Sequence, residues 1–385
     1  MVSAIINKKA ARRLERGHPW VFKSDILSLP ETDGGVVEVL DDRKRLLGQA
    51  LFSPRSTITL RLIRRDRGAV DRLFLKERVE HALERRERAL SGADAFRVIH
   101  GEADLLPGIF ADRYADAVVL QTTCAGAAAL EPLLVDILVE VLSPRILVVR
   151  NDASSRRHEG LSHESRIAHG IAPATAVFHE GEIPLEVDLL ADQKTGAFLD
   201  QSLNHVAAGR YARGEALDCF TYHGGFALQL ARGCTSVVAV DQSKPALERG
   251  RRNAERAGIR NIEWTAANVL DLLPRLVDAG RRFDTLVVDP PAFASTAKTL
   301  EAAGRAYKEV NLRAMRLLRP NGILVTCSCS GRITAADFEA VIEAAARDAH
   351  RSVQVLERRG AGPDHPVLSG VPETEYLKCR ICSVL

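Results

Sequence analysis

Short apolar runs alternate with helix-like stretches through the C-terminal half of the chain, and this alternation limits the fold more than any other feature. The apolar runs span residues 216–220, 237–241, 262–264, 285–289 and 323–326, and stretches such as 245–257 and 300–318 separate them. Buried parallel strands joined by helical crossovers have this pattern, so we predict a doubly wound, mostly parallel α/β sheet. Two later strands, 352–358 and 376–382, are linked without a helix, which predicts an antiparallel pair at the sheet edge.

Two segments precede this sheet. The first, to about residue 70, is predicted to be small and β-rich, with strands at 36–40 and 57–63. A helix is predicted from residue 70 to 90, where apolar residues recur at helical spacing. Strands at 117–121 and 146–150 follow, with a helix between them.

The positive charge of the chain is concentrated at its N-terminus. The net charge is +3, but residues 1–65 contain thirteen Lys or Arg against seven Asp or Glu, among them Arg12, Arg16 and Lys44. A basic module on a nearly neutral body is typical of proteins that bind a polyanion. A solubilising surface is the alternative interpretation.

Composition indicates a cytoplasmic protein. No apolar stretch reaches the ~18 residues of a membrane helix, and the first sixteen residues contain no apolar core of a secretory signal. The seven cysteines are scattered through the chain, which favours reduced thiols over a disulfide framework.

Polar and glycine residues follow the predicted strands, where ligands bind in sheets of this class. Asp218 lies in the first strand and is followed by Gly224 and Gly225, which would let the backbone approach a ligand closely. Asp241 ends the next strand, where a carboxylate can accept hydrogen bonds from both ribose hydroxyls of a nucleoside cofactor. Asn268 follows the third strand, at a position suited to an adenine edge.

Asp289-Pro290-Pro291-Ala292-Phe293 follows the fourth strand. Two consecutive prolines stiffen the loop and hold the Asp289 carboxylate in place. Phe293 could then stack on a flipped base, or it could simply be a core residue.

Cys329 lies just beyond the fifth strand and is the candidate nucleophile. A thiolate that attacks C6 of a pyrimidine makes C5 nucleophilic enough to accept a methyl group. An inert buried cysteine is one alternative. A zinc site that also includes Cys327, Cys379 and Cys382 is another, although residues 379 and 382 of one strand would face opposite ways. We therefore expect no metal.

These motifs resemble, nearly from end to end, those of the PUA-containing 23S rRNA (cytosine-5) methyltransferases, which use S-adenosylmethionine (SAM). The matching segments are 17–22 (Gly-His-Pro-Trp-Val-Phe), 100–108, 112–114, 194–201 (Lys-Thr-Gly-Ala-Phe-Leu-Asp-Gln), 219–226 (Cys-Phe-Thr-Tyr-His-Gly-Gly-Phe), 289–293, 328–330 and 374–378. The resemblance implies an RNA-binding PUA-like domain at residues 1–70, a small α+β middle domain at 71–188 and a class I SAM-dependent methyltransferase domain with a seven-stranded sheet at 189–385.

The resemblance also implies roles for residues of the site. The residues assigned to SAM are Phe198, Gln201, Asp218, Phe220, Thr221, Gly224, Gly225, Asp241, Asn268 and Asp289. Asp289 is also the active-site acid, and Cys329 rather than Cys327 is the nucleophile. The chain departs from the family at Ser202 and His205, where arginine is usual, and at His223 and Asn268.

The expected function is formation of 5-methylcytosine in ribosomal RNA, expected to be 23S, through a covalent bond between Cys329 and C6. Ala292 stands where the wider cytosine-5 enzymes have a cysteine that helps to release product, so Asp289 or an ordered water must remove the C5 proton. The alternatives are a guanine or uracil-5 methyltransferase and a non-catalytic RNA-binding assembly factor. A homodimer is left open.

Overall fold

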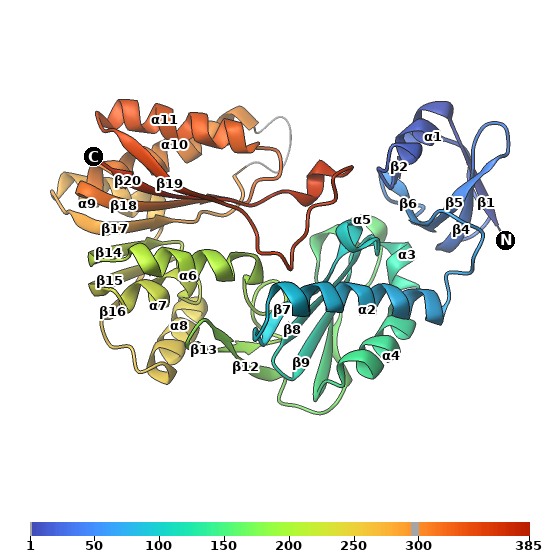
Figure 1. Cartoon of the computed structure of the whole chain (residues 1–385), viewed down its shortest axis with the longest axis horizontal. Coiled ribbons are helices and arrows are strands. Elements are labelled where there is room, and N and C mark those ends of the chain that lie inside the picture. Colours follow the sequence, from blue (N-terminus) through green and yellow to red (C-terminus); the bar gives the residue numbers. More distant parts are fainter. Residues whose placement is uncertain (1, 294–299) are drawn as a thin grey trace. The chain divides into compact units, whose positions relative to one another are not determined.

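The computed structural model describes residues 2–293 and 300–385. The chain divides into two compact units, coloured along the sequence in Figure 1. Unit 1 comprises Met1–Phe178, Val187–Ala197 and Pro363–Thr374, and unit 2 comprises His179–Glu186, Phe198–Gly362 and Glu375–Leu385. The division into domains at residues 70 and 188 remains a prediction from the sequence.

Unit 1 begins with a six-stranded sheet in the order β2-β6-β5-β4-β1-β3. The elements are β1 (Ser3–Ile6), α1 (Lys8–Glu15), β2 (Trp20–Phe22), β3 (Ile26–Ser28), β4 (Gly35–Leu40), β5 (Leu46–Phe52) and β6 (Ile58–Arg64). The buried face of α1 (Ala10, Ala11 and Leu14) packs into the same core as the inward-facing residues of these strands. Asn7 caps α1 by accepting the N–H of Ala10 at 2.9 Å.

A second sheet of unit 1 has the order β11-β10-β9-β8-β7. Its strands are β7 (Ala95–His100), β8 (Ile109–Tyr114), β9 (Ala117–Thr122), β10 (Ile146–Arg150) and β11 (Ser165–His169), and the helices around it are α2 (Arg72–Ala89), α3 (Ala125–Ala128), α4 (Glu131–Leu142) and α5 (Ser154–Glu159). Apolar residues of α2 and α4 join the strands in one buried cluster, because each helix presents one apolar stripe to the sheet.

A buried ion-pair network lies between α2, the 3₁₀ turn Gly101–Asp104 and β7 of unit 1. The side chains of Arg86 and Asp104 are 1% and 0% exposed, and two hydrogen bonds of 2.7 and 2.6 Å join them. Asp104 also accepts the N–H of His100, and Arg86 donates to the carbonyl oxygen of Asp364 at 2.8 Å. The network therefore ties residues 363–374 to the rest of unit 1.

Unit 2 contains a seven-stranded sheet in the order β16-β15-β14-β17-β18-β20-β19 (Figure 1). Its strands are β14 (Gly214–Cys219), β15 (Cys234–Asp241), β16 (Ile262–Ala266), β17 (Phe283–Val288), β18 (Leu318–Ser328), β19 (Val353–Arg359) and β20 (Lys378–Val384). Five strands are parallel, and β20 runs antiparallel to both β18 and β19. The predicted doubly wound sheet with an antiparallel pair at its edge is confirmed.

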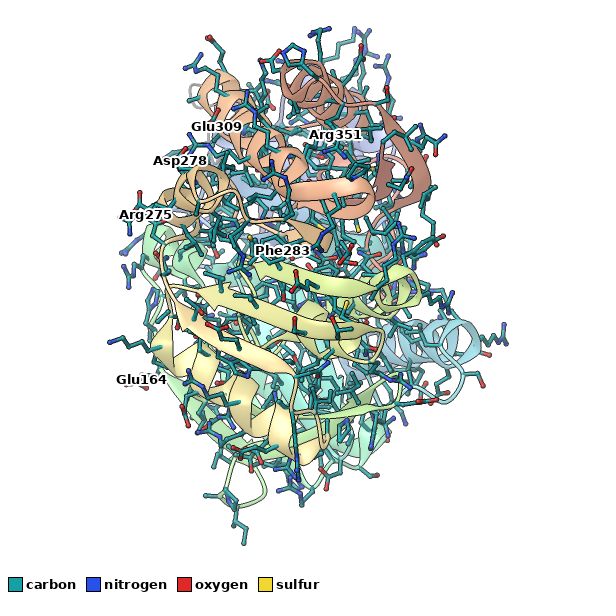
Figure 2. The ribbon with its side chains drawn as sticks, turned by 90° about the vertical axis from the view of Figure 1, so that its left-hand side faces the viewer. Glu164, Arg275, Asp278, Phe283, Glu309 and Arg351 are labelled. Carbon is teal, nitrogen blue, oxygen red and sulfur yellow. The ribbon has the colours of Figure 1, made fainter. Side chains whose placement is uncertain are left out.

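Helices cover both faces of this sheet. They are α6 (Ser202–Tyr211), α7 (Gly225–Ala231), α8 (Lys244–Arg256), α9 (Val269–Asp278), α10 (Leu300–Leu317) and α11 (Ala335–Ala349). One core cluster contains residues of α9, α10 and α11, and another contains residues of α6 and α7. Arg351, labelled in Figure 2, fastens the end of α11 by donating to the carbonyl oxygens of Met315, Leu318, Arg319, Val384 and Leu385.

Several elements were not predicted from the sequence. They include β1, α1, β2 and β3, the strands β7, β8 and β11, and a two-stranded sheet of β12 (Thr175–Glu180) and β13 (Ile183–Asp188). The strands β2 and β3 have only three residues each, too few for an alternation to be recognised. No helix within the described ranges is long and apolar enough to cross a membrane.

Candidate active site

The carboxyl ends of five parallel strands bring the predicted site residues to one edge of the sheet in unit 2. Following the strand order β16-β15-β14-β17-β18, this edge carries Asn268, Asp241, Asp218, Asp289 and Cys329. Residues that are up to 111 positions apart in the sequence, from Asp218 to Cys329, therefore follow neighbouring strands. This edge is where a sheet of this class binds its ligand.

The turn after β14 has a strained backbone. Phe220 and Tyr222 have φ angles of 66° and 49°, and Gly224 has a φ of 85°. Residues with a side chain rarely adopt positive φ, and such strain is concentrated at functional sites. The turn is held by a hydrogen bond from the N–H of Gly224 to the carbonyl oxygen of Thr221, 2.8 Å long.

The glycines of this turn leave no room for a side chain. A Cβ atom at Gly224 would lie 2.5 Å from the Trp264 ring, and one at Gly225 would lie 2.4 Å from Cε1 of His205. Glycine is therefore required at both positions by the close packing of Trp264 and His205 against the turn.

Asp218 is fully buried at the end of β14. Its Oδ2 accepts hydrogen bonds from the Thr221 hydroxyl and from the N–H of Ala227, whereas its Oδ1 has no hydrogen-bond partner among the described residues. Burial raises the pKa of Asp218 to about 7; the Asp289 charge adds to the rise, while the Thr221 hydroxyl, the His205 charge and the Ala227 N–H oppose it. Buried polar oxygens are usually hydrogen-bonded, so Oδ1 of Asp218 is an unsatisfied acceptor at this edge of the sheet.

Asp241 at the end of β15 is held by two backbone groups. The N–H of Tyr222 donates to Oδ2 at 3.0 Å and the N–H of Ser243 to Oδ1 at 2.9 Å. Each oxygen keeps a further lone pair, so the carboxylate is oriented and can still accept two more hydrogen bonds.

Asn268 caps α9 by accepting the N–H of Leu270 at 2.9 Å, which leaves its amide N–H₂ group as the available donor.

Gln201 connects the Asp289 carboxylate to the segment before α6. Its Nε2 donates to Oδ2 of Asp289 at 2.9 Å, and its Oε1 accepts from Nδ2 of Asn204 at 2.7 Å. Phe198 lies edge-on to Tyr222, with ring centroids 5.0 Å apart, and so borders the strained turn. The structure thus brings Phe198 and Gln201 to the residues that the sequence assigned to the cofactor.

His205 and Glu180 form a buried pair that the sequence interpretation did not include. Nδ1 of His205 lies 2.7 Å from Oε1 of Glu180, and the imidazole also packs against Phe226. Burial alone would lower the pKa of His205, but the carboxylate of Glu180, with Asp289 and Asp218, outweighs it and the pKa is raised. The raised pKa favours the protonated imidazole, whose charge interacts with the carboxylates of Asp289 and Asp218.

Cys329 differs from the other cysteines in its exposure. All seven lie within the described residues; six are buried, and Cys329 is partly exposed. Its Sγ lies 3.9 Å from the carbonyl oxygen of Pro290, in the loop that contains Asp289. Phe293 of that loop is half-buried and lies edge-on to Tyr307, with centroids 4.8 Å apart. The structure therefore brings the thiol and the Asp-Pro-Pro-Ala-Phe loop together.

Family models match two parts of the chain. Residues 4–65 match the PUA-like domain, and residues 153–378 match the S-adenosylmethionine-dependent methyltransferase. The second match covers more than half of the chain. The chain belongs to the S-adenosylmethionine-dependent methyltransferases. It is thus an enzyme whose cofactor is SAM, as the family resemblance implied.

Curated relatives match the chain along nearly its full length. The chain is 38% identical to "Ribosomal RNA large subunit methyltransferase I" of Shewanella denitrificans, with 97% of each chain covered. It is 37% identical to the protein of the same name from Aliivibrio fischeri, with 100% of each covered. Among solved structures, an S-adenosylmethionine-dependent methyltransferase from Streptococcus mutans has a TM-score of 0.84 at 20% identity, over 100% of both chains. That identity supports the fold alone.

The described residues fit SAM. The unpartnered Oδ1 of Asp218 suits a ligand that carries a hydrogen-bond donor or a positive charge. Asp241 would hold the ribose and Asn268 would donate to the adenine. The carboxylates of Asp218 and Asp289 would favour the positive charge of the sulfonium.

Asp241→Ala is expected to weaken SAM binding by about 1.5–3 kcal/mol, because hydrogen bonds to a charged acceptor are lost. Titration calorimetry measures the change. The matched control is Asp278→Ala at the C-terminal end of α9, where Figure 2 labels an exposed carboxylate. Unchanged affinity in a folded Asp241→Ala variant would remove Asp241 from the site.

SAM affinity is expected to rise with pH up to about 7, the pKa to which burial raises Asp218. The SAM sulfonium favours the ionised form of the Asp218 carboxylate, so SAM binding below this pKa is coupled to loss of a proton from Asp218. Above this pKa the carboxylate is already ionised, and the affinity should no longer change with pH. S-adenosylhomocysteine has the same amino and carboxylate groups without the sulfonium charge, and its affinity should vary less. Calorimetry from pH 5.5 to 8.5 compares the two, and equal slopes would contradict the role of Asp218.

Proposed function

We propose that this enzyme forms 5-methylcytosine in the RNA of the large ribosomal subunit, 23S in bacteria, through a covalent bond between Cys329 and the base. The full-length similarity to proteins named ribosomal RNA large subunit methyltransferase I supports rRNA as the substrate. One observation supports cytosine C5 as the methylated position. A partly exposed thiol lies beside the Asp-Pro-Pro-Ala-Phe loop at the sheet edge, and methylation of cytosine at C5 needs such a nucleophile.

In the proposed mechanism the Cys329 thiolate adds to C6 of the cytosine and forms an S–C6 bond. The electron pair displaced from the C5–C6 double bond makes C5 nucleophilic. SAM, when bound, would supply the electrophilic methyl group that C5 takes up, and the broken S–CH3 bond would leave S-adenosylhomocysteine. Loss of the C5 proton then restores the double bond and expels the Cys329 thiolate, which returns the enzyme to its starting state.

Asp289 would orient the cytosine from the strand end beside Cys329. Gln201 holds the Asp289 carboxylate by a hydrogen bond of 2.9 Å, and two prolines stiffen the loop that follows. This carboxylate or an ordered water would accept the C5 proton. Phe293, whose ring is half-buried and packs at an angle against Tyr307, would stack on the flipped base.

The PUA-like domain at residues 4–65 would contact RNA phosphates. Arg12, Arg16, Arg43 and Lys44 are exposed on α1 and on the turn between β4 and β5. The hydrogen bond from Arg45 to Glu15, 2.6 Å long, brings this turn to the C-terminal end of α1. Clustered exposed cations of this kind bind a phosphate backbone in a salt-dependent way.

We also propose a cytoplasmic location. A homodimer is compatible with this function and is not required by it.

Transfer of labelled methyl groups from SAM to rRNA, followed by digestion to nucleosides and mass spectrometry, tests the proposal. The substrate is rRNA from a strain that lacks the enzyme. We expect 5-methylcytidine at one position. Methylguanosine or 5-methyluridine would contradict the choice of base, and the absence of transfer to free rRNA and to assembled subunits would favour a non-catalytic assembly factor.

A further inference from the structure

A buried lysine lies next to the candidate nucleophile in unit 2. Lys378 is the first residue of β20 and is 4% exposed. It pairs in the antiparallel register with Ser328, the last residue of β18, so it lies opposite the strand end from which Cys329 follows. A lysine is almost never buried so completely without a partner that requires it.

The Lys378 ammonium group is held by two backbone carbonyl oxygens, one of them on the residue that follows Cys329. Nζ donates to the carbonyl oxygen of Ser330 at 2.7 Å and to that of Tyr376 at 2.8 Å. Neither acceptor is a carboxylate, so these bonds fix the position of the ammonium group without neutralising its charge. Ser330 is the residue after Cys329, so the ammonium group is anchored to the backbone next to the candidate nucleophile, and the Cys329 charge acts on it.

We propose that Lys378 is a positioning residue that keeps Cys329 in its thiolate form for attack on the base. The inference rests on the proposed function of Cys329 as a nucleophile. A fixed ammonium charge in a partly desolvated position stabilises a neighbouring thiolate, and the thiolate is the reactive form of cysteine.

The charged groups around Lys378 are consistent with this role. Burial lowers the pKa of Lys378 to about 8, whereas the charges of Cys329, Glu375 and Asp337 raise it and that of Arg380 lowers it. The amine is therefore mostly protonated at pH 7 and loses its charge as the pH rises through about 8. From α10, Tyr307 also faces the thiol, and burial, together with the Cys329 charge, raises the pKa of its hydroxyl, which stays neutral.

Arg380 offers a matched control. It lies two residues further along β20, on the same face, and is equally buried, but Nε donates to the Glu339 carboxylate at 2.8 Å, which neutralises its charge. Replacing Arg380 removes from the same strand a cation that is hydrogen-bonded to a carboxylate and not to the residue after Cys329.

The rate at which iodoacetamide alkylates Cys329 tests the proposal on the full-length protein, with the modified residue identified by mass spectrometry. In Lys378→Met the rate at pH 7 should fall about ten-fold, equivalent to about 1.4 kcal/mol, and should return to the wild-type value near pH 10. Lys378→Arg, which retains a charge, should keep most of the wild-type rate at pH 7, and Arg380→Met should keep all of it.

An unchanged rate at pH 7 in a Lys378→Met protein that still binds SAM would overturn the proposal and leave Lys378 as a structural clamp on two carbonyl groups. If Lys378→Met does not fold, Lys378→Arg decides: a ten-fold slower alkylation in a folded, charge-retaining variant would contradict a role through charge. The measurement needs no RNA. If the alkylation rates of the Lys378 variants are as expected but Cys329→Ser retains full turnover, the covalent mechanism is rejected while the effect of Lys378 on the thiol stands.

Discussion

Cys329→Ser is expected to reduce methyl transfer to rRNA by at least about a thousand-fold, equivalent to about 4 kcal/mol in the activation free energy. A serine hydroxyl is far less ionised than a thiol near neutral pH, so the S–C6 bond has no adequate replacement. SAM binding should not change, because Cys329 is not among the residues assigned to the cofactor, which lie before α6 and at the ends of β14, β15, β16 and β17 rather than β18. Single-turnover transfer of labelled methyl groups and calorimetry measure the two quantities.

Cys327→Ser is the matched control for this variant. Cys327 lies within β18, two residues before Cys329, and is fully buried. Burial raises the pKa of Cys327 well above its usual range, so its thiol is expected to stay protonated and inert. The Cys327→Ser enzyme should retain most of its activity. Loss of transfer in Cys327→Ser together with turnover by Cys329→Ser would move the nucleophile to residue 327.

Asp104→Ala is expected to destabilise unit 1 by about 3–5 kcal/mol, because removing one partner of a buried ion pair leaves the other charge uncompensated. The partner is Arg86, whose side chain is 1% exposed and donates two hydrogen bonds to Asp104. The N–H of His100 would lose its acceptor as well.

Urea unfolding followed by Trp20 fluorescence measures this change. The chain has two tryptophans, so a Trp264→Phe background leaves Trp20 as a probe of unit 1. Glu84→Ala is the control, since Glu84 forms an exposed pair with Arg88 on the same helix, and such pairs contribute little. Equal urea midpoints for Asp104→Ala and Glu84→Ala would contradict a stabilising role of the buried network.

The sheet of unit 2 and its functional edge could be predicted from the sequence because both depend on local signals. Buried parallel strands are short apolar runs, and a residue such as Asp241 or Cys329 is found by its place at the end of such a run. The edge position of these residues then follows from the direction of parallel strands. Asn268 was placed correctly after its strand, but its role as the cap of α9 emerged only from the structure.

Other parts of the site depend on contacts that leave no local pattern. Glu180 and His205 are 25 residues apart and meet only in the folded unit. Tyr222 contributes a backbone N–H to Asp241 through a left-handed conformation that its residue type does not predict. A lysine at the start of a strand suggests an exposed side chain, so the burial of Lys378 beside Cys329 could not be foreseen.

Trapping with RNA that contains 5-fluorocytosine at the target position tests the central claim most directly. Fluorine at C5 cannot leave as a proton does, so after methyl transfer the enzyme should stay joined to C6. With SAM present, we expect a protein–RNA adduct that survives a denaturing gel, maps to Cys329 by mass spectrometry and is missing in Cys329→Ser. Methylation of unmodified RNA without any adduct on the fluorinated RNA, or an adduct that persists in Cys329→Ser, would contradict covalent catalysis by Cys329.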